Sequence, residues 1–425
     1  MNPTTWVYLS SLLIIGTYFK FRRFWSVRNL DLALLLGLSP GLLLVAHDLE
    51  AWGFAWLFAV GACILLRLLL DPLMIRRPLL EPNLSAEGLF FTGIALLVFL
   101  TANVITGKLT ESDLEGARRL DQILARRELP PEESGTSWHG PGYPLFYLFA
   151  SFSNKALIAD DDTQPEHYQR AMIRATTTRT TAILGHLAVV AGIVLIGYRH
   201  FDNFQMGVAA ASLYLLLPYT AQMTARVDHV IPAALLVWAM ASYRRPAVAG
   251  ILMGLAIGVI WYPLFLLPLW GSFYWHRGLY RFAGAVAGAL LAVIASLALT
   301  SSTLSSFFAQ LMQMLGGTIL SMEGASGFWL YHEPAFRIPI LAAFVVMSIG
   351  LALWPAHKNL GTLLSCSAAV MVGVQFWHAQ EGGLFMGWYL PLLLLTVFRP
   401  NLEDRVAEMA VIDGRFPWRR LAAAA

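Results

Sequence analysis

The chain has 425 residues, 57% of them hydrophobic and 13% charged, with a formal net charge of +3 at pH 7. Its mean hydropathy is +0.62. This composition excludes an ordinary soluble globular protein, and the small net charge gives no basic footprint for nucleic-acid binding. Cys63 and Cys366 both fall inside apolar runs, which argues against a disulfide or a zinc site.

Apolar runs recur along the whole chain and predict an all-α polytopic membrane protein with about thirteen transmembrane helices. The first run has no basic residue before it and no cleavage site after it, so it is expected to be a helix and not a signal peptide. Pro263 interrupts the run 247–275, which forms either one kinked helix or two short ones. The expected spans are residues 6–19, 30–47, 53–70, 88–106, 181–197, 204–221, 230–243, 247–262, 263–275, 281–299, 338–355, 360–376 and 383–398.

Lysine and arginine are concentrated in alternate short loops. "KFRRFWSVRN", "SYRRP" and "HRGLYR" are rich in them, whereas "DLEAWG" and "WHAQEGG" have none. Basic loops stay on the cytoplasmic side, so the pattern predicts a multi-pass protein of the inner (cytoplasmic) membrane. It also predicts an N-terminus outside and a cytoplasmic C-terminus.

Two predicted outer loops are long, at residues 107–180 and 300–337. Their semi-apolar stretches "PLFYLFASF" and "LSSFFAQLMQMLGGTIL" predict helices that lie in the membrane interface. Such loops on one face of a bundle indicate a site at that surface. Within the spans, GxxxG spacing predicts close helix packing at Gly250, Gly254 and Gly258, and again at Gly284 and Gly288.

Asp113 stands a few residues beyond the span 88–106, at the start of the helical pattern "DLEGARRLDQIL". One interpretation makes it an N-cap or first-turn acid, favoured there by the helix dipole. The other makes it a general base for a hydroxyl brought to the membrane surface. The two can hold together. Glu111, Glu115 and Asp121 are its rivals in the same segment.

Four features follow one another along the chain. They are an apolar helix, then "SD", then "GPGYPLF", and later "RVDHVIPAALLVWAMASYRRPAVAGILMGLAIGVIWYPLFLLPLW". This order resembles membrane glycosyltransferases of the GT-C superfamily, over roughly residues 88–300. The nearest likeness is to bacterial relatives of the dolichyl-phosphate-mannose protein mannosyltransferases, which include lipid A aminoarabinose transferases. The chain differs in its three extra N-terminal helices, in Trp261 and Tyr262 where a lysine is usual, and in lacking a C-terminal soluble domain.

The resemblance implies four regions. Residues 1–87 would be extra N-terminal transmembrane helices, and 88–300 a GT-C-like catalytic core with the outer loop 107–180. Residues 301–398 would hold an outer loop and the C-terminal transmembrane helices, and 399–425 a cytoplasmic tail.

The implied activity is transfer of a sugar from a polyprenyl-phosphate donor to an acceptor hydroxyl of a lipid, glycan or protein at the outer face. Asp113 would be the catalytic base. The "PGYP" segment would form the floor of the cavity, with Tyr143, Phe146, Tyr147 and Phe149 at the lipid interface. Membrane lipids are further expected partners, and nucleic acid is not.

A charged lipid-phosphate leaving group needs cationic or hydrogen-bonding partners. Arg226 is the leading candidate because it shares a short outer turn with Asp228 and His229, and three ionisable residues at that depth are costly without a purpose. The expected substrate-binding residues are Arg226, Asp228, His229, His139, Tyr143, Arg174, Arg179 and Arg337.

No cofactor is expected. His139, His332, Glu333 and His378 could supply metal ligands, but no HxxxH or DxD spacing supports a divalent metal site.

Other functions remain open. A transporter or flippase of lipid-linked sugars would share the helix count, and a surface-polysaccharide polymerase or ligase would share the substrates. A non-catalytic scaffold would leave Asp113 dispensable. A transporter should carry ionisable residues or broken helices near mid-membrane, whereas the polar residues here gather in the outer loops and favour surface chemistry.

Overall fold

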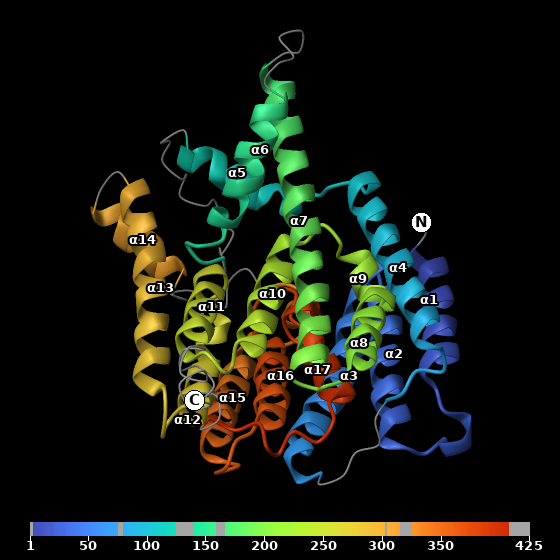
Figure 1. Ribbon diagram of the computed structural model, residues 1–425. Coiled ribbons are helices and arrows are strands. Elements are labelled where there is room, and N and C mark those ends of the chain that lie inside the picture. The colour runs from blue at the N-terminus through green and yellow to red at the C-terminus, as the bar shows by residue number, and fades with distance from the viewer. Residues whose placement is uncertain are drawn as a thin grey trace, which may run out of the picture.

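The computed structural model describes residues 3–74, 80–124, 139–158, 166–301, 304–314 and 325–407. Parts of both predicted outer loops and most of the predicted tail, 408–425, lie outside these ranges. In the described ranges the regular structure is helical, and β contacts are limited to isolated bridges. The helices pack side by side as a bundle (Figure 1). The all-α prediction is therefore confirmed.

Seven helical segments of the described chain are long and apolar enough to cross a membrane, so the chain is a multi-pass membrane protein. The helices in these segments are α2 (Val27–Ala46), α3 (Glu50–Leu69), α4 (Ala86–Thr106), α7 (Glu166–Arg199), α13 (Leu279–Thr300), α15 (Arg337–Leu353) and α16 (Leu360–Trp377).

The remaining predicted spans contain shorter helices. They are α1 (Pro3–Tyr18), α8 (Phe204–Leu216), α9 (Pro218–Gln222), α10 (Val227–Ala241), α11 (Pro246–Val259), α12 (Leu267–Phe273) and α17 (Leu390–Phe398). Each is shorter than the roughly 20 residues that cross a bilayer unaided, so thirteen crossings remain a prediction. The run 247–275 forms two helices, α11 and α12, joined by the 3-10 turn Tyr262–Leu266.

The helices α5 (Glu111–Leu124) and α6 (Leu148–Ile158) lie with the start of α7 beyond one end of the bundle (Figure 1). We call this the loop end, and the opposite end the tail end. α7 begins at Glu166, well before the expected residue 181, because "EHYQRAMIRATTTRT" continues the helix without a breaker. The third helix of the predicted outer loops is α14 (Leu304–Met314).

Four buried charges join helices at the tail end. Arg67 contacts Asp31 from Nε at 2.7 Å and from Nη2 at 3.0 Å, and its Nη1 lies 3.0 Å from Asp71 Oδ1. Arg399 Nη2 lies 2.6 Å from Asp71 Oδ2. Two arginines thus face two carboxylates, and removing one partner of such a buried set leaves an uncompensated charge. The network ties α2 and α3 to the end of α17.

The glycines of α11 pack against α13. A Cβ at Gly250 would lie 2.5 Å from the Phe282 carbonyl oxygen, and one at Gly254 would lie 2.8 Å from that of Val286. Close packing of α11 is thus confirmed. The prediction is wrong for Gly284 and Gly288, since a Cβ at either would meet nothing within 4 Å in the described structure.

We expect Gly254→Ala to lower the melting temperature, because its methyl group would push against the backbone of α13. Overpacking of this kind costs about 1–3 kcal/mol. Gly288→Ala is the matched control and should leave the melting temperature unchanged or slightly higher, as alanine favours a helix. Thermal unfolding of the detergent-solubilised variants measures both. Equal melting temperatures for the two variants would contradict the α11–α13 contact.

Candidate functional site

The segment from His139 to Tyr147 is held by the broken end of α11. Ile260 is extended there (φ −137°, ψ 133°), and Pro263 prevents the helix from continuing. The backbone N–H of Gly140 donates to Val259 O at 2.7 Å, and that of Gly142 donates to Gly258 O at 2.8 Å. The loop therefore satisfies carbonyl groups that the end of α11 leaves without helical partners.

Only glycine fits where the loop meets α11. A Cβ at Gly140 would overlap the carbonyl oxygen of Gly258, and one at Gly142 would lie 2.9 Å from it. The "GPG" sequence is thus required by this close approach. The contact places His139 beside the bundle, as an isolated antiparallel bridge between His139 and Ile260 confirms.

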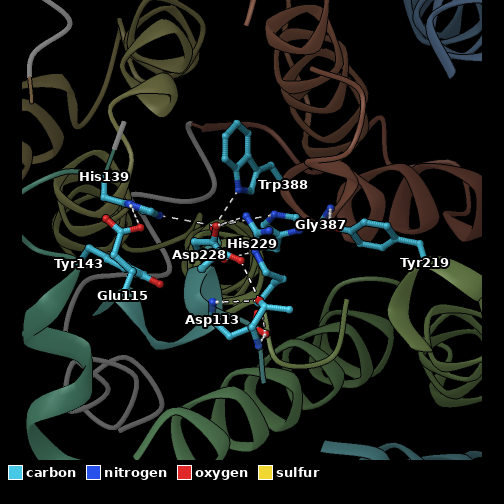
Figure 2. A network of polar contacts seen from close by, with 12 residues as sticks. Asp113, Glu115, His139, Tyr143, Tyr219, Asp228, His229, Gly387 and Trp388 are labelled. Carbon is cyan, nitrogen blue, oxygen red and sulfur yellow. Dashed lines mark hydrogen bonds and ion pairs between the residues drawn. The ribbon is translucent and has the colours of Figure 1, made fainter. Parts of the chain in front are cut away.

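His139 lies between two carboxylates. Its Nδ1 is 3.7 Å from Glu115 Oε2 on α5, and its Nε2 is 3.6 Å from Asp228 Oδ2 on α10. The imidazole stacks on Tyr143 with ring centroids 4.2 Å apart. Figure 2 shows His139 between Glu115 and Asp228. A single imidazole therefore connects the loop-end helix α5 to the bundle.

Asp228 is the centre of the site and is only 2% exposed. Arg226 holds it with two bonds, Nε to Oδ1 at 3.1 Å and Nη2 to Oδ2 at 2.8 Å. His229 Nε2 lies 3.7 Å from Asp228 Oδ2 on another side. The sequence "RVDH" places all three residues at the start of α10, which explains how a short stretch builds most of the cluster.

A largely buried segment, residues 378–389, lies between α16 and α17, contains only the 3-10 turn Met386–Trp388, and covers the other side of Asp228. Trp388 Nε1 donates to the Asp228 carbonyl at 3.0 Å, and the Gly387 N–H donates to Tyr219 Oη at 2.8 Å. Tyr219 Oη in turn lies 2.5 Å from His229 Nδ1 (Figure 2). The span expected at 383–398 is α-helical only from Leu390 because this segment bends at Gly383, with φ +99°, to reach the site.

Glu115 completes the cluster from α5. Arg119, one turn further along the same helix, lies 2.5 Å from its Oε1. Burial raises the pKa of Glu115, but His139 and Arg119 outweigh burial and lower the pKa to about 2.

Burial lowers the pKa of His139, but Asp228 and Glu115 outweigh it and raise the pKa above its ordinary value. We name Glu115, Arg119, His139, Arg226, Asp228 and His229 the loop-end cluster.

Asp113 is buried at the start of α5. Its Oδ2 accepts the Thr110 backbone N–H at 2.8 Å and the Thr110 hydroxyl at 2.7 Å, and its own N–H points at that hydroxyl at 3.4 Å. This is the reciprocal arrangement of a capping box, so Asp113 does have the predicted role at the helix start. Its Oδ1 makes no hydrogen bond to a described residue.

Four of the predicted substrate-binding residues belong to the loop-end cluster, and a fifth, Tyr143, stacks beside them. The four are Arg226, Asp228, His229 and His139.

The other three predicted substrate-binding residues are held elsewhere. Arg174 Nε pairs with Asp121 Oδ2 at 2.6 Å. Arg179 Nη2 donates to Gly107 O at the end of α4, and Arg337 Nε donates to Trp377 O at the end of α16, both at 3.1 Å. The last two arginines thus cap helix ends.

Tyr143, Phe146, Tyr147 and Phe149 were expected at the lipid interface, and this is wrong for the two tyrosines. They are 1% and 0% exposed, and their hydroxyl groups lie 2.7 Å apart. Tyr147 packs against α5 where Gly116 offers no side chain. Phe149, by contrast, is 72% exposed. The segment is therefore a core layer between α5 and α11.

Arg226, Asp228 and His229 stand at the loop end of α10. In Figure 1 the loop ends of α10 and α11 stop below those of α4 and α7. Because α10 and α11 are short, their ends leave room for the loop 139–147 and the segment 378–389. Ionisable groups at such depth in a membrane protein are costly and usually functional.

Among the described residues, no group of three or more histidine, cysteine, aspartate or glutamate side chains is arranged to hold a metal ion. Comparison of the chain with protein-family models, with curated proteins and with solved structures gives no match.

His139 makes the stability of the site dependent on pH. Its pKa is raised by folding, so its charged form stabilises the protein below the ordinary pKa of about 6.5, and this stabilisation is lost as the pH rises through the raised pKa. We expect the wild-type free energy of unfolding to fall across that window by at most about 1.4 kcal/mol per pH unit. The melting temperature should fall with it. His139→Gln should remove this component.

Thermal unfolding between about pH 6 and pH 9 measures the effect. The control is His276→Gln, since His276 is exposed and distant from the cluster in sequence. An identical pH profile for wild type and His139→Gln would show that His139 does not carry a raised pKa.

Proposed function

We propose that this protein is a membrane glycosyltransferase that moves a sugar from a polyprenyl-phosphate donor to an acceptor hydroxyl. The loop end would face the outside of the cytoplasmic membrane, with the N-terminus outside and the tail inside. The observation that supports this most directly is the loop-end cluster, where one buried and one half-buried carboxylate meet two imidazoles and two arginines at one end of an apolar bundle.

The transfer needs one base and one anion-binding group. The acceptor oxygen forms a bond to the anomeric carbon, the bond from that carbon to the phosphate oxygen breaks, and the lipid phosphate leaves with the electron pair. The acceptor proton passes to a carboxylate. Asp113 suits this role because Thr110 holds Oδ2 in place and Oδ1 is left for the acceptor.

Arg226 suits the leaving phosphate. Its side chain is 17% exposed, so it reaches the surface of the cluster, while the two bonds to Asp228 fix its guanidinium. A guanidinium that is already oriented stabilises developing negative charge without having to reorganise. Asp228 would then be a positioning residue, and His139 would connect it to α5.

A transporter of lipid-linked sugars is the second candidate. Discontinuous helices that meet at a polar site are typical of transporters, and α11 and the segment before α17 are both broken beside the cluster. A direct assay separates the two functions, because only the transferase forms a new glycosidic bond.

We expect Asp113→Asn to lower sugar transfer by about 10²–10⁴-fold, the usual contribution of a general base. Asparagine keeps the side-chain oxygen that accepts the Thr110 N–H, so the capping box survives while the base is lost. The measurement is transfer from radiolabelled polyprenyl-phosphate sugars in membranes carrying each variant.

Two controls separate chemistry from folding. Glu111→Gln removes an exposed charge at the start of the same helix and should leave transfer unchanged. Thr110→Ala removes the capping hydroxyl but keeps the carboxylate, so it should lower stability more than transfer. Equal transfer by wild type and Asp113→Asn would rule out Asp113 as the base, and movement of the intact lipid-linked sugar without transfer would favour the transporter.

A further inference from the structure

A polar cavity lies between α5, α6 and α7, apart from the loop-end cluster. Its volume is about 320 Å³, and its polar lining comes from Asp121 and Gln122 on α5, Lys155 on α6, and Arg170 and Arg174 on α7. None of these residues belongs to the cluster. The proposed transferase chemistry gives the cavity no role.

The described lining of the cavity is basic, because it contains three cations and one carboxylate. The carboxylate fixes one of the cations, since Asp121 Oδ2 lies 2.6 Å from Arg174 Nε. This contact uses Nε and leaves the two Nη groups for a ligand. Arg174 is 33% exposed and Asp121 is 21% exposed, so the pair is accessible from solvent. A fixed guanidinium next to further cations is suited to a phosphate group.

The same helices also expose large apolar side chains. Phe152, one turn from Lys155 on α6, is 59% exposed, and Tyr168 and Met172 on α7 are 53% and 49% exposed. Basic and apolar side chains together on the surface of a helix are typical of contact with lipid headgroups. The cavity itself is at the small end of ligand pockets, which measure about 300–1,000 Å³, so it suits a headgroup and not an acyl chain.

We propose that this cavity binds a phosphate group, carried either by the headgroup of an anionic lipid or by a soluble phosphate ester. Lys155 and Arg170 supply charge from α6 and α7, and Arg174, held by Asp121, supplies directed N–H donors. This site is additional to the donor site proposed above and does not depend on it, because none of its lining residues belongs to the loop-end cluster.

The test is native mass spectrometry of the full-length protein in detergent, titrated with phosphatidylglycerol in one arm and with glycerol 3-phosphate in the other. We expect Lys155→Gln/Arg170→Gln to weaken phosphate binding at least about tenfold, because two charged hydrogen-bond donors are lost. Saturable binding of the lipid alone identifies a headgroup site. Competition between the two ligands shows that the cavity recognises the phosphate they share. Both results support the proposal.

Lys108→Gln/Arg118→Gln is the matched control. It removes one lysine and one arginine from exposed positions near and on α5 that do not line the cavity, and it should change affinity less than about twofold. Gel filtration and melting temperature show that each variant is folded. Equal weakening by the two double variants, or no saturable binding of either ligand to wild type, would overturn the proposal. Sugar transfer by the same variants is a separate measurement, so this site can fail while the proposed function stands.

Discussion

The requirement that buried backbone be hydrogen-bonded shapes the loop end of this protein. α11 stops at Val259, inside the bundle, and the N–H groups of Gly140 and Gly142 satisfy its last carbonyls. This contact brings His139 to Asp228, brings Tyr143 and Tyr147 under α5, and so attaches the α5–α6 layer to the membrane body. Without it, neither α11 nor the loop would have partners for its polar backbone.

Both ends of the bundle hold close ion pairs between arginines and carboxylates, but the loop end adds a titratable imidazole between its two carboxylates. At the tail end, Arg67 and Arg399 meet Asp31 and Asp71 at 2.6–3.0 Å, which are direct, closed ion pairs. At the loop end, His139 lies 3.6 and 3.7 Å from its two carboxylates, distances beyond those of a direct hydrogen bond. Tight pairs suit a structural tie, whereas a titratable imidazole between two carboxylates makes the loop end respond to pH.

Features that depend on local pattern can be predicted from the sequence. Apolar runs locate the helices, "RVDH" locates most of the cluster, and "GPG" marks a constrained loop. The proximity of Glu115 to His139 cannot be predicted in this way, because it depends on the end of α11, more than a hundred residues later. The segment 378–389 is predicted to be partly helical, since its hydropathy resembles that of a span. Tyr143 and Tyr147 look like interface anchors until α5 is placed over them.

The break between α11 and α12 also bears on how the protein acts. A path for a polar substrate through the bundle would need a continuous polar lining at the break, whereas mainly aromatic side chains fill it and His378 is the polar side chain that packs on Tyr262 among the described ring contacts. Trp261 and Tyr262 pack against Trp377 at 5.6 and 5.5 Å, and Tyr262 stacks on Trp388 at 5.2 Å. All four are buried, and Trp388 also donates to the Asp228 carbonyl. Aromatic packing beside the loop-end cluster supports a rigid base for chemistry at one membrane surface more than it supports alternating access from both sides.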